Sequence, residues 1–148
     1  MVWRQLKKAW KKHFGQEEWR KSFQIHLFML DGAHNPEGIK TFAHSIQKYS
    51  GPKKIIVSIL ADKNYQEMLG MLKSIPNTEI ILTTFDYPRA MMAEEVIQIG
   101  KNEGISLNPD WQQVLGNLYE TETNTKIFIT GSLYFISEVR KYLLASKR

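Results

Sequence analysis

The sequence predicts an α/β fold in which helices cover a parallel or mostly parallel sheet. Strand-like and helix-like patterns alternate about five times, and the loops between them are short. The continuous apolar run Ile55-Ile56-Val57 is typical of a strand that is buried on both faces, as in a parallel sheet. A length of 148 residues suits one domain, and we expect its crossover connections to be right-handed.

The first strand and helix surround the stretch on which the site prediction depends. The apolar run 25–30 predicts a strand, which stops abruptly at Asp31. Asn35 suits a helix N-cap, and Pro36 suits the first helical position because an N–H there would have no partner. The apolar positions that follow have helical spacing, namely Ile39, Phe42, Ala43 and Ile46.

Two further strand–helix pairs occupy the middle of the chain. Residues 54–60 and 79–83 are rich in Ile, Val and Leu and predict strands. A helix over 65–75, capped by Asn64, follows the first of these strands. The helix after the second strand has an apolar face made by Met92, Val96 and Ile99.

The last third of the chain repeats the same alternation. Residues 105–107 predict a short strand, and Asn108-Pro109 repeats the cap-and-proline pair before a helix over 111–118. Residues 126–130 predict the last strand, and Gly131-Ser132 turns into a final helix. Its expected inward positions are Leu133, Ile136, Val139 and Leu143.

The positive charge lies in residues 1–23, which form an N-terminal arm in this interpretation. The chain has a net charge of +5, and this arm holds seven basic and two acidic residues, so the remainder is neutral. Residues 1–14 predict a basic amphipathic helix. Such a helix binds a membrane surface or a nucleic acid, or it packs its Trp stripe on the domain or on a neighbour. We favour packing and expect no nucleic-acid binding by the fold.

The composition excludes several classes of protein. There are no cysteines, which rules out disulfides, Cys-based zinc sites and a thiol nucleophile and fits a reducing compartment. No apolar run approaches the roughly 20 residues of a membrane span. The N-terminus also lacks the apolar core of a signal peptide. We expect a cytoplasmic location.

Polar side chains follow four of the predicted strands. Because the carboxyl ends of parallel strands meet at one edge, we expect these loops to gather there. Carboxylates suit ribose hydroxyls, and cations and helix N-termini suit phosphates, so the loops favour a phosphorylated ligand. Simpler roles stay open, since Asp62 and Ser132 also suit helix caps and His34 suits a hydrogen bond within its loop. The candidate residues are Asp31, His34, Asp62, Lys63, Asp86, Arg89 and Ser132.

Several catalytic motifs are absent from this sequence. No P-loop occurs, no G-x-G-x-x-G follows a strand, and neither H-E-x-x-H nor G-x-S-x-G is present. We predict no metal site and no catalytic residue within this chain. The loops thus supply parts of a nucleotide pocket without a phosphate cradle.

The stretch Leu-Asp-Gly-Ala-His-Asn-Pro-Glu-Gly at 30–38 closely resembles the Asp-Gly-Ala-His-Asn-Pro signature of folylpolyglutamate synthases, including the bifunctional dihydrofolate synthases. Residues 61–64 are similar to the family's Asp-Lys-Asp loop, and residues 87–90 resemble its Pro-Arg-Ala segment. Residues 130–134 look like its last strand-to-helix turn. The resemblance runs from about residue 25 to the C-terminus. The family's Pro-Gly-Arg stretch has no clean match at 19–23.

The resemblance implies a place in the Mur ligase superfamily. The chain looks like the smaller C-terminal domain, a mixed, mostly parallel six-stranded sheet in a Rossmann-like three-layer arrangement. That domain closes over ATP, while the P-loop and most Mg²⁺ ligands lie on a larger N-terminal domain. In the family's reaction a folate carboxylate is phosphorylated, and the amine of L-glutamate attacks the acyl phosphate to form an amide.

The resemblance also implies roles for individual residues. Asp31 would bind the ribose, His34 would contact the nucleotide, and Ser132 would lie near the nucleotide and the interdomain cleft. Four residues remain candidates for substrate or interdomain contacts, namely Asn35, Asp62, Lys63 and Arg89.

We therefore expect two parts, a basic arm over 1–23 and a Mur ligase C-terminal-like domain over 24–148. The first hypothesis is the nucleotide-capping domain of a folylpolyglutamate synthase, inactive alone because the P-loop domain is absent. The first alternative is a non-catalytic homologue that binds a nucleotide or a partner through its Trp-rich arm. The second alternative is a stand-alone nucleotide sensor.

Overall fold

The computed structural model describes residues 23–145 apart from 26, 122 and 123. The helix expected over 1–14 lies outside the described residues, as does the connection after it, so both stay predictions.

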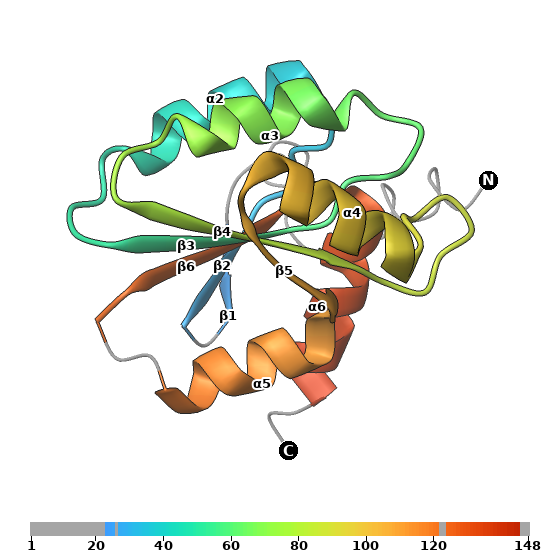
Figure 1. Ribbon diagram of the computed structural model, residues 1–148. Helices are drawn as coiled ribbons and strands as arrows, with labels where there is room; N and C mark the ends of the chain where they lie inside the picture. Colours follow the sequence, from blue (N-terminus) through green and yellow to red (C-terminus); the bar gives the residue numbers. More distant parts are fainter. Residues whose placement is uncertain (1–22, 26, 122–123, 146–148) are drawn as a thin grey trace.

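The described residues build a six-stranded sheet in the order β1-β2-β6-β3-β4-β5 (Figure 1). Neighbouring strands run parallel except for β1 and β2, which are antiparallel. The mixed, mostly parallel sheet is thus confirmed. The strands are β1 Phe23–Ile25, β2 Phe28–Leu30, β3 Lys53–Val57, β4 Thr78–Thr84, β5 Ser106–Asp110 and β6 Lys126–Thr130.

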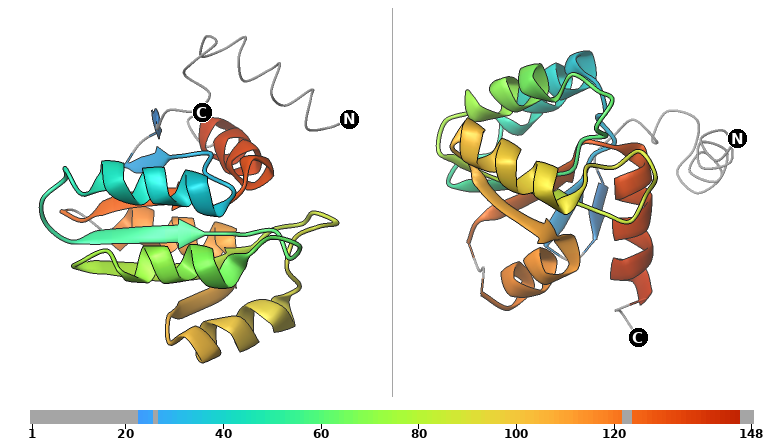
Figure 2. Two further views of the ribbon diagram at one scale, coloured as in Figure 1. Left: turned by 90° about the horizontal axis from the view of Figure 1, so that it is seen from above. Right: turned by 45° about the vertical axis from the view of Figure 1, so that its right-hand side comes forward.

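In the described part of the chain, five helices cover the two faces of this sheet and complete three layers. One face packs against α2, α3 and α4, and the opposite face packs against α5 and α6 (Figures 1 and 2). The helices are α2 Pro36–Ile46, α3 Tyr65–Lys73, α4 Ala93–Glu103, α5 Trp111–Thr121 and α6 Leu133–Ala145.

The central strands divide their side chains between the two faces. In β3, Ile55 and Val57 join the core under α2 and α3, whereas Ile56 joins the core under α5 and α6. In β6, Phe128 and Ile129 divide in the same way. All five side chains are at most 1% exposed. This two-sided burial explains the uninterrupted apolar runs, because neither face of a central strand meets water.

The expected single strand over 25–30 is wrong, because this stretch contributes to two strands. Phe23 pairs with Leu30 and Ile25 with Phe28, so β1 and β2 are antiparallel neighbours. Only β2 pairs with β6. The apolar run misled the assignment because both strands of a tight hairpin carry buried side chains.

The prediction that Asn108 and Pro109 form a second helix cap is also wrong. Asn108 and Pro109 lie in β5, which is longer than the strand expected over 105–107. The cap of α5 is Asp110, whose Oδ1 accepts a hydrogen bond from the Gln113 N–H at 3.1 Å. Proline is tolerated in β5 because this strand lies at the edge of the sheet.

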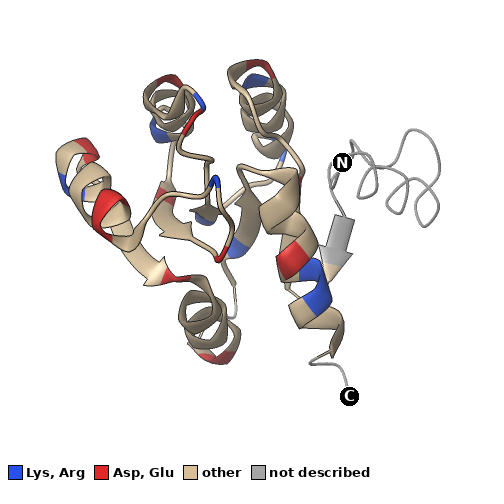
Figure 3. Cartoon of the chain, turned by 90° about the vertical axis from the view of Figure 1, so that its right-hand side faces the viewer, with Lys and Arg blue, Asp and Glu red and all other residues tan. Residues whose placement is uncertain are grey.

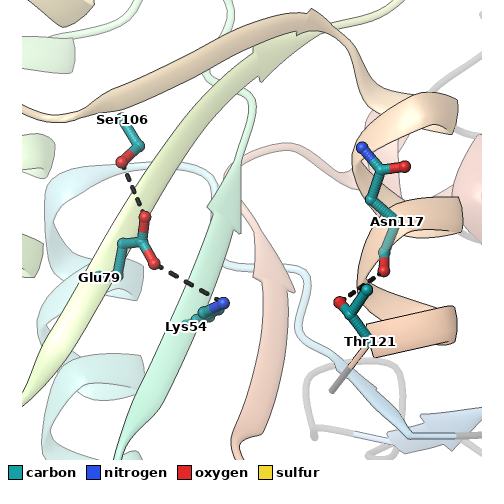
Figure 4. A network of polar contacts seen from close by, with 5 residues as sticks. All are labelled: Lys54, Glu79, Ser106, Asn117 and Thr121. Atoms are coloured by element: carbon teal, nitrogen blue, oxygen red, sulfur yellow. Dashed lines mark hydrogen bonds and ion pairs between the residues drawn. The ribbon is translucent and has the colours of Figure 1, made fainter.

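A polar row links β5 to its neighbours near the amino ends of the strands (Figure 4). Lys54 of β3 lies opposite Glu79 of β4, and their charged atoms are 3.8 Å apart. Ser106 of β5 donates a hydrogen bond to the same carboxylate at 2.8 Å. In α5, Thr121 donates to the backbone carbonyl of Asn117 at 2.7 Å. The three-strand row specifies the register of the edge strand.

Candidate functional site

The candidate site lies at the carboxyl edge of the sheet, where the loops that follow β2, β3, β4 and β6 emerge. The parallel pairing of these four strands brings the loops to the same edge. In open α/β sheets this edge is where ligands bind. The predicted gathering of the polar loops is confirmed at the level of the fold.

The loop after β2 holds Asp31 in a defined orientation. Its backbone N–H donates to the Ile129 carbonyl at 2.9 Å, which continues the pairing of β2 with β6. Its side-chain Oδ1 accepts a hydrogen bond from the Ala33 N–H at 2.9 Å, and the residue is only 9% exposed. The carboxylate of Asp31 is therefore oriented by a hydrogen bond within its own loop.

The same loop places His34 and Asn35 at the start of α2. The Nδ1 atom of His34 lies 3.0 Å from the Gly32 carbonyl oxygen, which can only accept, so Nδ1 carries the proton. In neutral imidazole, Nε2 is then the acceptor nitrogen. Asn35 Oδ1 accepts from the Gly38 N–H at 2.8 Å, and Pro36 is the first residue of α2. The predicted cap and the predicted loop contact of His34 are both confirmed.

The turn after β6 is joined directly to the Asp31 loop. The Gly131 N–H donates to the Ala33 carbonyl at 3.0 Å, and the Thr130 hydroxyl approaches the same oxygen at 3.4 Å. Gly131 has φ 116°, and a Cβ there would lie 2.2 Å from the Ser58 backbone oxygen. Only glycine fits this position.

Ser132 caps the last helix, α6, which is the simpler role that the sequence left open. Its Oγ accepts hydrogen bonds from the Tyr134 and Phe135 N–H groups at 3.2 and 3.4 Å. The residue is 1% exposed. Its hydroxyl is therefore used as a cap, and the α6 N-terminus rather than the Ser132 side chain is the part of this turn that suits an anion.

Asp62 and Arg89 meet across two loops, 27 residues apart in sequence. Arg89 Nε donates to Asp62 Oδ2 at 2.9 Å, and Nη2 donates to Oδ1 at 3.3 Å. Asp62 is thus an ion-pair partner and caps no helix, since Asn64 accepts from the Glu67 N–H at 3.3 Å and caps α3. Lys63 is half-buried beside the pair.

Sequence reasoning missed an aromatic stack beside this ion pair. The rings of Tyr87 and Tyr134 are stacked at 4.5 Å with an interplanar angle of 24°, and Phe85 stacks on Tyr87 at 5.5 Å. The pKa of Tyr134 is raised, first by burial and then by a hydrogen bond with Tyr87. A signal was present, because both tyrosines belong to segments that resemble family motifs.

Charges of both signs are interspersed over the described part of the chain (Figure 3). Among the described residues, no group of three or more His, Asp or Glu side chains could hold a metal ion. Nor does any helix in the described ranges have the length and hydropathy needed to cross a bilayer.

The arrangement offers two neighbouring kinds of chemistry along one edge. Asp31, His34 and the α2 N-terminus present acceptors and backbone donors, which suit a nucleoside with its phosphates. The ion pair of Asp62 with Arg89 and the adjacent cation of Lys63 suit an acidic group. The loop contacts through Ala33 hold the first set against the α6 turn.

Solved structures with the same architecture are folylpolyglutamate synthases. One from Thermotoga maritima superposes with a TM-score of 0.68 at 24% identity, covering 86% of this chain and 30% of that chain. Escherichia coli FolC in complex with ADP gives a TM-score of 0.67 at 18% identity, covering 81% of this chain and 29% of that chain. The bifunctional folylpolyglutamate synthase/dihydrofolate synthase of Yersinia pestis, complexed with AMPPNP and Mn ion, gives a TM-score of 0.67 at 20% identity. The match covers 82% of this chain and 30% of that chain. At these identities the likeness defines the fold class.

Sequence relatives identify the family. Residues 17–143 match the family described as dihydrofolate synthetase, C-terminal domain. The dihydrofolate synthase/folylpolyglutamate synthase of Bacillus subtilis is 36% identical over 117 residues, which is 77% of this chain and 27% of the relative. The folylpolyglutamate synthase of Lacticaseibacillus casei is 36% identical over 124 residues, 82% of this chain and 28% of the relative. The chain belongs to the dihydrofolate synthetase C-terminal domain family, and it spans little more than a quarter of these relatives.

Proposed function

We propose that this chain acts as the nucleotide-capping C-terminal domain of an ATP-dependent folylpolyglutamate synthase. One observation carries the proposal: the Asp31 loop and the α6 turn are joined through the Ala33 carbonyl at the carboxyl edge. This places an oriented carboxylate, an oriented imidazole and two helix N-termini on adjoining loops. Solved relatives with ADP or AMPPNP bound support the choice of nucleotide.

Each residue of this site has a separate task in the proposal. Asp31 accepts hydrogen bonds from the ribose hydroxyls, and His34 contacts the nucleotide through Nε2. The backbone N–H groups at the start of α6, which Ser132 caps, lie toward the phosphates and the cleft. Asn35 keeps α2 in register behind the loop, and Lys63 and Arg89 contact the acidic substrate or the other domain.

The full reaction needs a second domain in this proposal. A P-loop domain, in the same or another polypeptide, would bind the triphosphate and supply most ligands of Mg²⁺. Folate carboxylate would be phosphorylated by ATP, and the amine of L-glutamate would displace phosphate to form the amide. The present chain holds the nucleoside side of ATP, helps to exclude water and is inactive by itself, because it lacks the residues that contact the γ-phosphate.

Nuclear magnetic resonance of the isotope-labelled chain, titrated with ATP and Mg²⁺, tests the proposal. We expect weak binding, on the order of millimolar, because most phosphate contacts are missing. Shifts should centre on 31–35 and 130–134. Asp31→Asn and His34→Ala should each weaken binding, and Glu120→Gln, which changes an exposed carboxylate in the last turn of α5, should not. Shifts centred elsewhere, or unchanged affinity in Asp31→Asn, would overturn the nucleotide assignment.

A further inference from the structure

The loops that carry Asp62 and Arg89 are fastened to each other through their backbones. The Ala61 N–H donates to the Arg89 carbonyl at 2.9 Å, and Leu60 and Ala90 form an isolated antiparallel bridge. Both contacts lie next to the Asp62–Arg89 ion pair in the chain. The separation of the two side chains is therefore specified by the main chain and not only by their mutual attraction.

The ion pair uses one edge of the Arg89 guanidinium. Nε and Nη2 donate to the two oxygens of Asp62 at 2.9 and 3.3 Å. A guanidinium has five N–H donors in a fixed plane, so a partner on this edge fixes the direction of the others. Among the described residues no acceptor is recorded for Nη1.

Arg89 is held beside the stacked tyrosines. Its charge acts on both Tyr87 and Tyr134, whose rings are 4.5 Å apart. Tyr87 is itself sandwiched between Tyr134 and Phe85. Arg89 therefore lies close to both the aromatic stack and the Asp62 carboxylate.

The Asp62–Arg89 ion pair is too exposed to contribute much to the stability of the fold. The Asp62 side chain is 56% exposed and the Arg89 side chain 44% exposed. Solvent-exposed ion pairs contribute little to the free energy of unfolding, because water and salt screen them. The hydrogen bond from Arg89 is the main cause that lowers the pKa of Asp62. A bidentate geometry specifies orientation more than it stabilises the fold.

We propose that Asp62 is a positioning residue, which holds the guanidinium of Arg89 so that its Nη1 edge binds a carboxylate of an acidic substrate. Asp62 does not touch that substrate. Lys63, the next residue, adds a second cation near the same group. The identity of the substrate as L-glutamate rests on the proposed function, whereas the positioning role rests on the geometry of the pair.

The test follows the Arg89 side-chain Nε–H signal of the isotope-labelled chain while L-glutamate is added. In the wild-type chain we expect a sharp, shifted Nε–H signal that moves further with L-glutamate and not with sodium chloride at equal ionic strength. Asp62→Asn should lose the characteristic signal and bind L-glutamate about fivefold more weakly. Asp62→Glu, which can rebuild the pair, should recover part of both. Glu120→Gln, which changes an exposed carboxylate in the last turn of α5, should match the wild type.

The outcomes separate this inference from the proposed function. If Asp62→Asn keeps its spectrum dispersed but binds L-glutamate as the wild type does, Asp62 has no positioning role. If L-glutamate moves no Arg89 signal while ATP still shifts residues 31–35, the inference fails and the nucleotide site stands. If neither ligand causes shifts, both proposals fail. If Asp62→Asn unfolds, the positioning role is tested with Asp62→Glu and Arg89→Lys instead. Arg89→Lys should abolish the bidentate geometry and weaken L-glutamate binding.

Discussion

Replacing Gly131 by alanine should destabilise the whole domain. Gly131 has φ 116°, and the new Cβ would lie 2.2 Å from the Ser58 oxygen and 2.8 Å from its carbon. An alanine forced into this positive-φ conformation destabilises the fold by about 1–3 kcal/mol. The overpacking against Ser58 adds about 1–3 kcal/mol. The contact is with backbone, so no side-chain rotation relieves it. The expected loss of roughly 2–6 kcal/mol is a large part of the 5–15 kcal/mol typical of a domain.

Urea unfolding followed by circular dichroism measures this loss, with Gly70→Ala as the matched control. Gly70 lies in α3, and nothing lies within 4 Å of a Cβ placed there, so alanine should stabilise by about 0.8–1 kcal/mol through helix propensity. Gly131→Ala should also weaken ATP binding, because its N–H holds the Ala33 carbonyl. A Gly131→Ala variant whose unfolding free energy stays within about 0.5 kcal/mol of the wild type would refute the reasoning.

Two smaller predictions concern the α2 cap and the half-buried phenol of Tyr134. Asn35→Ala removes the hydrogen bond to the Gly38 N–H and should cost about 1 kcal/mol in urea unfolding, whereas Asn35→Asp should retain stability. For Tyr134, burial and the hydrogen bond with Tyr87 raise the pKa above the ordinary 10.0. The folded state then keeps a proton that the unfolded state loses, so this contribution to stability is complete below pH 10 and disappears as pH rises through the folded pKa. Ultraviolet titration of wild type against Tyr134→Phe should show one tyrosine ionising late in the wild type alone.

Local signals predicted the elements well where neighbouring residues alone decide the structure. Asn35 and Pro36 cap α2 because both act on the first turn of their own helix. The same pair at 108–109 failed, because pairing of β5 with β4 overrides the local preference of those residues. The split of 25–30 into two strands was missed for a related reason, since partner strands are not visible in an apolar run.

The candidate site was predictable in its location and much less in its contacts. Strand-end loops with polar residues predicted where Asp31 and His34 lie, and the caps at Asn35 and Asn64 followed from residue type. The Asp62–Arg89 pair joins positions 27 residues apart, and no periodicity connects them. The stacked tyrosines come from the loop after β4 and from the first turn of α6, and the approach of these two segments depends on the order of strands. Pairings of this kind require the three-dimensional topology.

The position of β6 in the sheet has a consequence for how the domain is made. This strand is the last in sequence, yet it lies between β2 and β3. As the chain leaves the ribosome, β2 and β3 are synthesised long before β6, the strand that joins them. One edge of β2 and one edge of β3 therefore stay unpaired until β6 is made. The contact between Thr130 and Ala33 spans 97 residues, and it completes the loop that holds Asp31. A nascent chain that ends before residue 126 therefore lacks the strand that pairs with both β2 and β3 and holds the Asp31 loop in place.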